Sequence, residues 1–270
     1  MSKITRPPFK CHGGKFYLES WIIEQFPANY ESMDYIEPYI GGGSVLLNKL
    51  PSTGMEVIND LDEGIVQIFR ALRDEPINFI GRLKRTKYSE NTFNRALKKS
   101  EDTDRDYVDH AINEFILRRM SRGGLKTNFA WSDRERNGQP GDVNAWETII
   151  RDHLPKISKR IEHIHIFNKS ALEIIQAFND ANTLLYCDPP YVAETRVSKD
   201  AYSYEMSTDD HIALSEAIHQ FKGKVIISGY PSALYKRLFS TWRCVKRKIA
   251  NHASQQKVKK MKTEQLWINY

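Results

Sequence analysis

The stretch Asp188–Tyr191 (DPPY) carries residue types that could bind a planar amino group. It follows the apolar run Thr183–Cys187, which predicts a buried strand, and open α/β sheets bind ligands where such strands end. Because prolines fix φ and donate no N–H, the Pro189 carbonyl should be held rigidly beside the Asp188 carboxylate. These two acceptors suit an –NH2 group on a base ring. They draw its lone pair out of conjugation, so that the nitrogen can attack an electrophilic methyl group, and Tyr191 adds a flat face for stacking the base.

A second pattern is the triple glycine Gly41–Gly43, which follows the apolar run Met33–Ile40 and precedes a helical pattern. Glycines let the backbone approach a ligand without Cβ clashes, and a helix N-terminus offers free N–H groups. Asp60 ends a second short strand, where an acid can accept hydrogen bonds from ribose hydroxyls. Neither a Walker A nor a GxGxxG pattern is present, which favours a smaller adenosine ligand over a dinucleotide. Each pattern alone also fits a purely structural turn, but their combination favours a ligand site.

Composition limits the class of protein. The chain has 270 residues, 40% of them hydrophobic, which suffices for one large α/β domain or a core domain with an insertion. The excess of 40 basic over 34 acidic residues gives a net charge of +6 and favours polyanionic partners, although only weakly. Cys11, Cys187 and Cys244 are far apart, which argues against a zinc site and a disulfide framework. Without an apolar leader or a long apolar run, we expect no membrane segment and a reduced cytoplasm.

The order of patterns along the chain indicates how the two motifs are positioned. Short apolar runs alternate with helical stretches toward both ends of the chain, which is typical of βαβ units and a parallel sheet. Between them, helical spacing dominates, most clearly over Val108–Met120. The segment Ser121–Asp142 is rich in Gly, Asn and charge and predicts a loop or hairpin. We therefore predict a catalytic domain of residues 1–60 and 147–270, interrupted by an inserted domain of residues 61–146.

These motifs together resemble the D12 class of DNA adenine-N6 methyltransferases, the family of the Dam enzymes. The resemblance runs nearly from end to end. The stretches that carry it are KCHGGK (Lys10–Lys15), which looks like the family's KWAGGK, IEPYIGGGSV (Ile36–Val45), NDLDEGI (Asn59–Ile65), DPPY and TEQLWIN (Thr263–Asn269). Of these, DPPY is similar to the catalytic motif of the family.

The resemblance implies a Rossmann-like class I methyltransferase sheet with an inserted, mainly helical target-recognition domain. It implies S-adenosylmethionine as methyl donor, no metal, and the N6 of an adenine flipped out of duplex DNA as acceptor. The implied donor-binding residues are Cys11, Lys15, Glu37, Gly41, Gly42, Gly43, Asp60 and Asp188. The residues implied to hold the adenine and act in catalysis are Asp188, Pro189, Pro190 and Tyr191. The setting would be the cytoplasm of a bacterial cell or phage-infected host, with a cognate restriction enzyme left open as a partner.

The chain departs from the family pattern in two places. Cys11 stands where KWAGGK has an aromatic residue, so Phe9 or His12 would have to take over stacking against the donor. In RRMSRGGLKTN (Arg118–Asn128), Gly123 replaces the expected Asn and the spacing to Asn128 is shifted. The family's common recognition sequence GATC is therefore not predicted for this chain.

Basic residues supply the candidates for DNA contact. The predicted contacts are Arg122, Lys126, Asn128, Lys257, Lys259 and Lys260. The last three belong to an acid-free run that starts at Arg243, which we expect to form a loop between the last two strands, although a solvated face is the alternative. Arg119 lies at the edge of the helical apolar stripe and is expected to be a buried, paired arginine. Phe129 and Trp131 fit either a wedge into DNA or packing under a hairpin.

Two other functions remain open from the sequence alone. One is a methyltransferase acting on cytosine N4 or a protein glutamine, although such enzymes more often have Ser or Asn in the place of Asp188. The other is a DNA-binding protein that has lost catalysis, which only the Cys11 departure supports.

Overall fold

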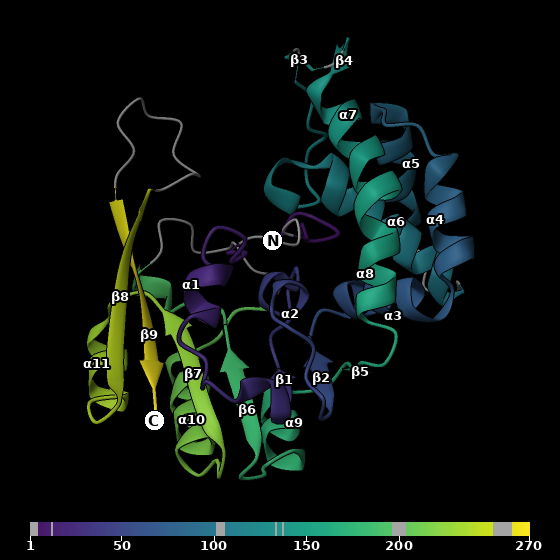
Figure 1. The fold of residues 1–270 in the computed structure, drawn as a ribbon. Helices are drawn as coiled ribbons and strands as arrows, with labels where there is room; N and C mark the ends of the chain where they lie inside the picture. Colours follow the sequence, from purple (N-terminus) through teal and green to yellow (C-terminus); the bar gives the residue numbers. More distant parts are fainter. Residues whose placement is uncertain are drawn as a thin grey trace. The chain divides into compact units, whose positions relative to one another are not determined.

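The computed structural model describes residues 5–11, 13–100, 106–132, 134–136, 138–195, 204–250 and 261–270. It divides into two compact units, each formed by three separate segments (Figure 1). The helical unit comprises Met1–Phe26, Ile40–Pro51 and Asp60–Asn168, and the sheet unit comprises Pro27–Tyr39, Ser52–Asn59 and Lys169–Tyr270. These units place the glycine turn with the helices, whereas the sequence analysis groups it with the catalytic residues.

Six strands of the sheet unit pair in the order β2-β1-β6-β7-β9-β8. Their bounds are β1 (Asp34–Glu37), β2 (Glu56–Asn59), β6 (Thr183–Cys187), β7 (Lys224–Gly229), β8 (Arg243–Ala250) and β9 (Met261–Ile268). Strands β2, β1, β6 and β7 are parallel to one another, while β9 is antiparallel to β7 and β8. The predicted α/β fold of the class I methyltransferase type, with parallel βαβ units, is confirmed.

The helices of the sheet unit begin at the serines that the sequence places before them. Helices α9 (Ala171–Ala177) and α10 (Thr208–His219) each start with a capping box, and the Ser232 side chain caps α11 (Ala233–Leu238). The parallel strands are buried on both faces and therefore read as continuous apolar runs. A short 3₁₀ turn, Ala193–Thr195, follows the DPPY stretch.

The end of the chain differs from the expectation of a loop after Arg243. Residues Arg243–Ala250 form β8, an eight-residue strand at the edge of the sheet, so the prediction of a loop is wrong for this part of the basic run. Exposed Lys and Arg side chains on an edge strand prevent pairing with other chains, which gives this charge a structural reason. Lys257, Lys259 and Lys260 lie outside the described residues.

The helical unit packs around aromatic and aliphatic side chains. Its helices are α1 (Glu19–Ile23), α2 (Ser44–Asn48), α3 (Glu63–Asp74), α4 (Pro76–Lys84), α5 (Glu90–Lys99), α6 (Tyr107–Met120), α7 (Gly141–Thr148) and α8 (Leu154–Arg160). A π-helical segment, Ile149–His153, joins α7 to α8, and the short strand β5 (His165–Phe167) follows. The predicted helix over Val108–Met120 is confirmed as α6. It is buried nearly all round, because α3, α4 and α5 all pack against it.

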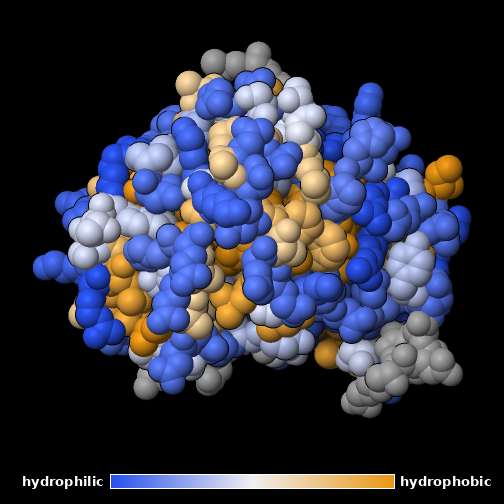
Figure 2. All heavy atoms as spheres, turned by 90° about the horizontal axis from the view of Figure 1, so that it is seen from below, coloured by the Kyte–Doolittle hydropathy of each residue, from blue (hydrophilic) through white to orange (hydrophobic). Residues whose placement is uncertain are grey.

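The loop after α6 leads into a small hairpin, β3 (Glu135–Arg136) with β4 (Gln139–Pro140). This agrees with the loop or hairpin predicted for Ser121–Asp142. Hydrophilic residues cover much of the face drawn in Figure 2, with apolar patches between them. In the described part of the chain, no helix combines the length and the apolar character that crossing a membrane would need.

Candidate active site

Asp188 follows β6 at the carboxyl edge of the sheet and is half-buried. Cys187 pairs with Ile227 of β7, which places the next residues of the two strands, Asp188 and Ser228, beside each other. The Ser228 hydroxyl donates to Asp188 Oδ1 at 2.6 Å. Behind it, the Tyr186 hydroxyl donates to Ser228 Oγ at 3.4 Å. The carboxylate predicted to be catalytic is therefore held by a buried hydroxyl that the sequence analysis did not single out.

Tyr191, at the other end of the DPPY stretch, is only 5% exposed. Its hydroxyl donates to Glu264 of β9, and its ring meets Tyr230 edge to face at a centroid distance of 4.7 Å. Burial first, and then the Glu264 carboxylate, hold the pKa of Tyr191 well above its ordinary value, so the hydroxyl remains a donor. In this arrangement the ring has little accessible surface for a stacked base.

Tyr230 lies at the same carboxyl edge of the sheet as Asp188. It directly follows β7, is half-buried, and has Lys262 Nζ 4.7 Å from its ring centroid. Lys262 therefore lies against an aromatic ring of the sheet unit, a position compatible with cation–π attraction. Tyr230 is not among the predicted site residues, although its place directly after a strand and beside a turn was a usable signal.

Glu37 ends β1, and Asp188 follows the neighbouring parallel strand β6. The order of the strands changes direction between β1 and β6, since β2 lies on one side and β7 on the other. Ligands of open α/β sheets bind at such a switch point, outside the carboxyl ends of the strands. Glu37 is buried and accepts a hydrogen bond from the Tyr35 hydroxyl at 2.8 Å. The sheet unit thus brings two predicted site residues, Glu37 and Asp188, to the edge where a ligand is expected.

The glycine turn of the helical unit requires glycines for two reasons. Gly41 and Gly43 have φ values of +47° and +71°, which L side chains rarely adopt. At Gly42 a Cβ would lie 3.2 Å from the Pro7 side chain. The turn is closed by the Asp60 carboxylate, whose Oδ2 accepts the Gly41 N–H at 2.9 Å. The structure therefore joins the predicted glycine turn and the predicted ribose acid directly.

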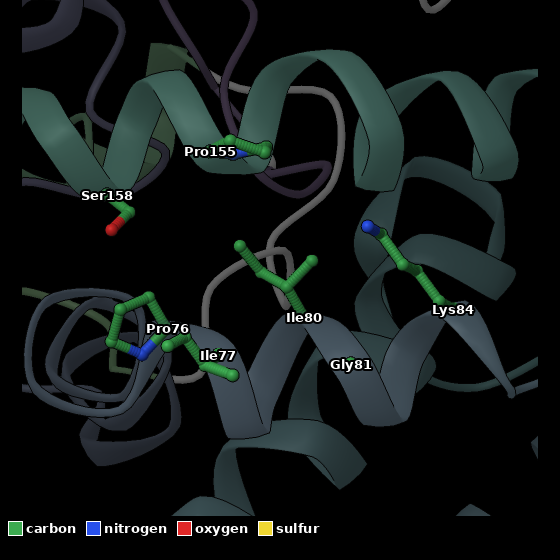
Figure 3. Close-up of a pocket in the computed structure, with 7 residues that line it drawn as sticks. All are labelled: Pro76, Ile77, Ile80, Gly81, Lys84, Pro155 and Ser158. Atoms are coloured by element: carbon green, nitrogen blue, oxygen red, sulfur yellow. The ribbon is translucent and has the colours of Figure 1, made fainter.

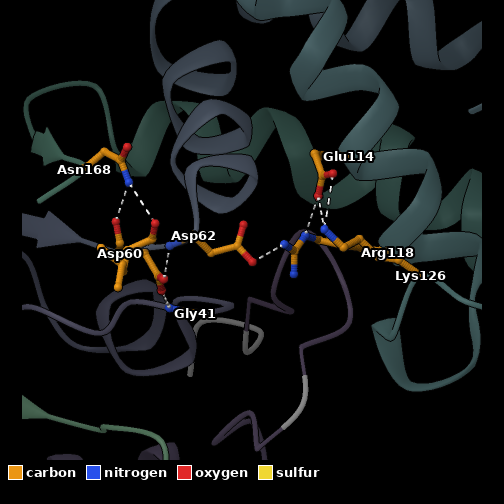
Figure 4. Close-up of polar contacts among 8 residues, drawn as sticks. Gly41, Asp60, Asp62, Glu114, Arg118, Lys126 and Asn168 are labelled. Carbon is orange, nitrogen blue, oxygen red and sulfur yellow. Dashed lines mark hydrogen bonds and ion pairs between the residues drawn. The ribbon is translucent and has the colours of Figure 1, made fainter. Parts of the chain in front are cut away.

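Asp60 is also bonded on its other oxygen, Oδ1, which accepts the Asp62 N–H at 3.0 Å (Figure 4). Burial raises the pKa of Asp60 to about 6, and the two backbone N–H donors offset only part of that rise. A carboxylate offers about four acceptor positions, so two backbone bonds leave capacity for ligand hydroxyls. Asp60 can accept hydrogen bonds from ribose hydroxyls while it keeps its hydrogen bond from the Gly41 N–H.

A network of buried charges continues from Asp62 through the helical unit (Figure 4). Arg118 Nη2 lies 2.7 Å from Asp62 Oδ2, and Arg118 Nε lies 3.2 Å from Glu114 Oε2. Lys126 Nζ approaches the same Glu114 oxygen at 3.1 Å. Burial opposes the charge on Asp62, but Arg118 holds the pKa of this carboxyl below its ordinary value. Arg118 is a buried, ion-paired arginine. Arg119 is half-buried as a residue, but burial lowers the pKa of its guanidinium to about 10, and its Nη2 donates to the Ala145 carbonyl at 3.2 Å.

The N-terminal motif is described except for His12. Lys15 is buried and donates to the Gly13 carbonyl at 2.8 Å. Cys11 is half-buried, with its Sγ 3.4 Å from where a Cβ on Gly41 would lie, so it borders the glycine turn. Phe9 is buried under the Arg118 guanidinium, 5.5 Å from its ring centroid, and is therefore poorly placed to replace the missing aromatic residue.

The predicted DNA contacts Arg122, Lys126 and Asn128 share the loop after α6. Arg122 and Asn128 are exposed. Lys126 is half-buried, has a positive φ of 63°, and forms an ion pair with Glu114. The loop is tied down at its base, where the Ser121 hydroxyl accepts the Lys126 N–H at 2.9 Å. Of the three predicted contacts, Arg122 and Asn128 are the ones on the surface.

Phe129 and Trp131 follow this loop and pack against Tyr88, with centroid distances of 5.4 and 6.4 Å. The Tyr88 hydroxyl donates to the Ala130 carbonyl, which ties the cluster to the loop. Trp131 nevertheless remains 49% exposed. Packing accounts for Phe129, whereas Trp131 combines packing with an exposed ring surface.

A hollow of about 430 Å³ lies between α4 and α8 (Figure 3). Its lining residues are Pro76, Ile77, Ile80, Gly81, Lys84, Pro155 and Ser158. None of them is a predicted site residue, and the lining holds no acid. This hollow therefore lacks the groups that methyl transfer to an amino group needs.

A family model described as "D12 class N6 adenine-specific DNA methyltransferase" matches residues 12–261. The chain belongs to this family. It is an adenine-specific DNA methyltransferase, as the resemblance of its motifs predicts. Among the described residues, no group of three or more His, Cys, Asp or Glu could hold a metal ion.

Curated relatives cover most of the chain at low identity. The type II methyltransferase M1.LlaDCHI of Lactococcus lactis subsp. cremoris is 25% identical over 88% of this chain and 86% of its own length. The DNA adenine methylase of Haemophilus influenzae is 21% identical over 97% and 92%, and that of Vibrio cholerae is 23% identical over 88% and 86%. Among solved structures, the rRNA methyltransferase aviRa of Streptomyces viridochromogenes covers 87% of this chain and 75% of its own length, at 9% identity and a TM-score of 0.35.

Proposed function

We propose that the enzyme transfers a methyl group from S-adenosylmethionine to the N6 of an adenine that has been flipped out of duplex DNA. The observation that carries this proposal is the Asp188 carboxylate at the end of β6, which accepts a hydrogen bond from Ser228, and the Pro189 carbonyl is predicted to lie beside it. The adenine lone pair forms the new N–CH3 bond while the C–S bond of the sulfonium breaks, with its electron pair going to sulfur. The methylated nitrogen then gives one amino proton to the hydrogen-bonded Asp188 carboxylate, which passes it to water. Before the transfer, the Asp188 carboxylate and the Pro189 carbonyl accept hydrogen bonds from the amino group and orient its lone pair.

The donor would bind through the glycine turn and Asp60. Two features of the helical unit support this. Gly41 and Gly43 adopt positive φ values that L side chains rarely adopt, and Asp60 beside them is a half-buried acid with remaining acceptor capacity. S-adenosylmethionine carries a sulfonium and an ammonium charge together with two ribose hydroxyls, and an ionised Asp60 attracts all of these groups. Lys15, Cys11 and Glu37 remain proposed donor contacts, of which Cys11 borders the turn.

Base flipping follows from the chemistry of the acceptor. The N6 amino group of a stacked, paired adenine is occupied by pairing and shielded from in-line attack, so the base must leave the duplex. Flipping costs a few kcal/mol, which hydrogen bonds to Asp188 and Pro189 and aromatic contacts would offset. Since Tyr191 is nearly buried, stacking on its ring requires a rearrangement, whereas the half-buried Tyr230 lies at the same edge.

Recognition of the target would fall to residues 61–146. Arg122 and Asn128 are the exposed polar residues of the loop after α6, and Trp131 presents an exposed ring nearby in the sequence. Arginine and asparagine are suited to base edges and phosphates alike. A basic contribution from Lys257, Lys259 and Lys260 remains a prediction. The names of the type II relatives support a restriction enzyme as partner, which we also keep as a proposal.

The proposal is tested with duplex oligonucleotides and S-adenosylmethionine labelled in the methyl group. Digestion to nucleosides and mass spectrometry should find the label in N6-methyladenine. Label in N4-methylcytosine, or in protein only, would contradict the proposed acceptor. Donor binding measured by calorimetry separates a catalytically inactive DNA-binding protein from an active enzyme that was supplied with the wrong DNA sequence.

A further inference from the structure

We propose that Ser228 and Glu264 are positioning residues for methyl transfer, because they fix the two ends of the Asp188–Tyr191 turn. This inference rests on the proposed function. Neither residue touches the reacting atoms. Each acts through a partner: Ser228 through Asp188, and Glu264 through Tyr191.

The Asp188 end needs such a restraint because prolines do not supply it. The ring of Pro189 fixes the backbone, but the plane of a carboxylate turns about a broad terminal torsion. Ser228 Oγ lies 2.6 Å from Asp188 Oδ1, and the serine is fully buried in β7. A hydroxyl donating to an ionised carboxylate forms a charge-assisted bond, which is stronger than a neutral one. Ser228 therefore sets the plane in which Asp188 can receive an amino hydrogen.

The Tyr191 end is fixed by the reverse arrangement, in which the turn residue is the donor. The Tyr191 hydroxyl donates to Glu264, whose side chain is 2% exposed. In the antiparallel pair of β7 and β9, Gly229 lies opposite Gln265, so Glu264 comes level with Tyr230 at the carboxyl edge of β7. A buried carboxylate at this edge of the sheet is costly without a donor, and the turn supplies that donor.

Both supports come from strands rather than from loops. Strands β7 and β9 pair with each other and with β6 and β8, so neither can shift without breaking the sheet. A site supported by such elements keeps its geometry better than one held by loops. A misplacement of about 1 Å can lower a rate about a hundredfold, so loss of either restraint should act on the methyl-transfer step.

The first test compares Ser228→Ala with Ser228→Thr, which retains the hydroxyl. We expect Ser228→Ala to slow the single-turnover rate of methyl transfer by about ten- to hundredfold, with donor and DNA affinities within about twofold of wild type. Ser228→Thr should recover most of the rate. The matched control is Ser215→Ala, which removes another buried hydroxyl of the same unit, on α10. A single-turnover rate for Ser228→Ala within about twofold of wild type would overturn the proposal.

The second test is a double-mutant cycle on the other end of the turn. Tyr191→Phe removes only the donor hydroxyl, and Glu264→Met removes the acceptor oxygens while keeping a side chain of similar length. Each should slow the single-turnover rate severalfold, and the double variant should be no slower than the slower single variant, because both remove one bond. Multiplicative effects would show that the two residues act independently and would contradict a shared positioning role.

A structural readout keeps this inference separate from the proposed function. In a crystal structure of Ser228→Ala, the Asp188 carboxylate should turn away from its wild-type orientation or become disordered. An unchanged carboxylate would overturn the role of Ser228 whether or not the enzyme methylates adenine. Failure of the wild-type chain to methylate any adenine, with this structural change present, would instead count against the proposed function.

Discussion

The Asp188–Tyr191 turn of the sheet unit and the Gly41–Gly43 turn of the helical unit are held by different kinds of contact. The first is tied by two hydroxyl–carboxylate hydrogen bonds to neighbouring strands. The second is tied by Asp60, behind which lies a chain of buried charges from Asp62 to Lys126. The difference indicates that the proposed catalytic turn, Asp188–Tyr191, depends on short-range geometry, whereas the glycine turn depends on charge. Substitutions at the Asp188–Tyr191 turn should therefore change the rate of methyl transfer. Substitutions at the Gly41–Gly43 turn and its charged neighbours should change the stability of the protein and the pH dependence of donor binding.

The largest effect is expected at Asp188. Asp188→Ala should lower the methylation rate by more than about a thousandfold, because it removes an acceptor placed for the transition state. The variant should remain folded, since the hydrogen bond with Ser228 is lost at a half-buried site. Initial rates with labelled donor, together with a circular dichroism melt, measure both. A variant that retains a tenth of the wild-type rate would remove Asp188 from the mechanism.

The next effect concerns stability in the helical unit. Arg118→Met should lower the free energy of unfolding by about 3–5 kcal/mol, because it leaves the buried carboxylates of Asp62 and Glu114 without their main partner. Urea denaturation at neutral pH gives the value. Arg151→Met is the matched control: its pair with Asp152 is exposed, and the unfolding midpoint should not move. Equal destabilisation by the two variants would show that the Arg118 network contributes no more to the free energy of unfolding than an exposed ion pair does.

Asp60 should have a smaller effect, on donor affinity. Asp60→Ala is expected to weaken S-adenosylmethionine binding by about 1.5–3 kcal/mol, the range for hydrogen bonds to charged groups. Calorimetry should find little change in DNA affinity. Unchanged donor affinity would contradict the ribose role.

The pH dependence of Asp60 sharpens this prediction. Its pKa is raised to about 6 by burial, so its contribution to stability is present below its ordinary pKa and is lost as the pH rises through about 6. Donor affinity should change in the opposite sense, because a protonated Asp60 loses charge and acceptor capacity as the pH falls through about 6. Calorimetry between pH 5 and 8, at roughly half-unit steps around that pKa, should show this loss in the wild type and not in Asp60→Ala.

The smallest effect is expected for two residues of the loop after α6, which we propose contacts DNA. Arg122→Gln should lower the slope of log K against log salt by about 0.9 if it contacts one phosphate of duplex DNA. Lys126→Gln should change the slope less, because Glu114 already engages the Lys126 ammonium. A salt titration of DNA binding compares them directly. A larger change for Lys126 would mean that this lysine leaves Glu114 when DNA binds.

The sequence predicts the sheet and the glycine turn well, because both depend on local patterns. Buried parallel strands read as apolar runs, and positive φ values require glycine at Gly41 and Gly43. The β8 strand was missed because charge dominates Arg243–Ala250, and a charged edge strand resembles a loop in sequence.

Long-range contacts could not be predicted in the same way. Ser228 ends an apolar run and Glu264 comes shortly before one, but their pairing with the DPPY turn depends on the strand order. Arg118 and Glu114 are spaced as an i, i+4 ion pair, which was a usable signal. Its third partner, Asp62, is 56 residues from Arg118 in sequence and could be found only in three dimensions.

The most direct measurement of the central claim is the identity of the methylated base. Wild-type enzyme and Asp188→Ala are incubated with a mixture of duplex DNA sequences and methyl-labelled S-adenosylmethionine, and the nucleosides are separated by mass spectrometry. We expect labelled N6-methyladenine from the wild type alone, although both proteins are folded. Label on another base, or equal labelling of adenine by the two proteins, would contradict it.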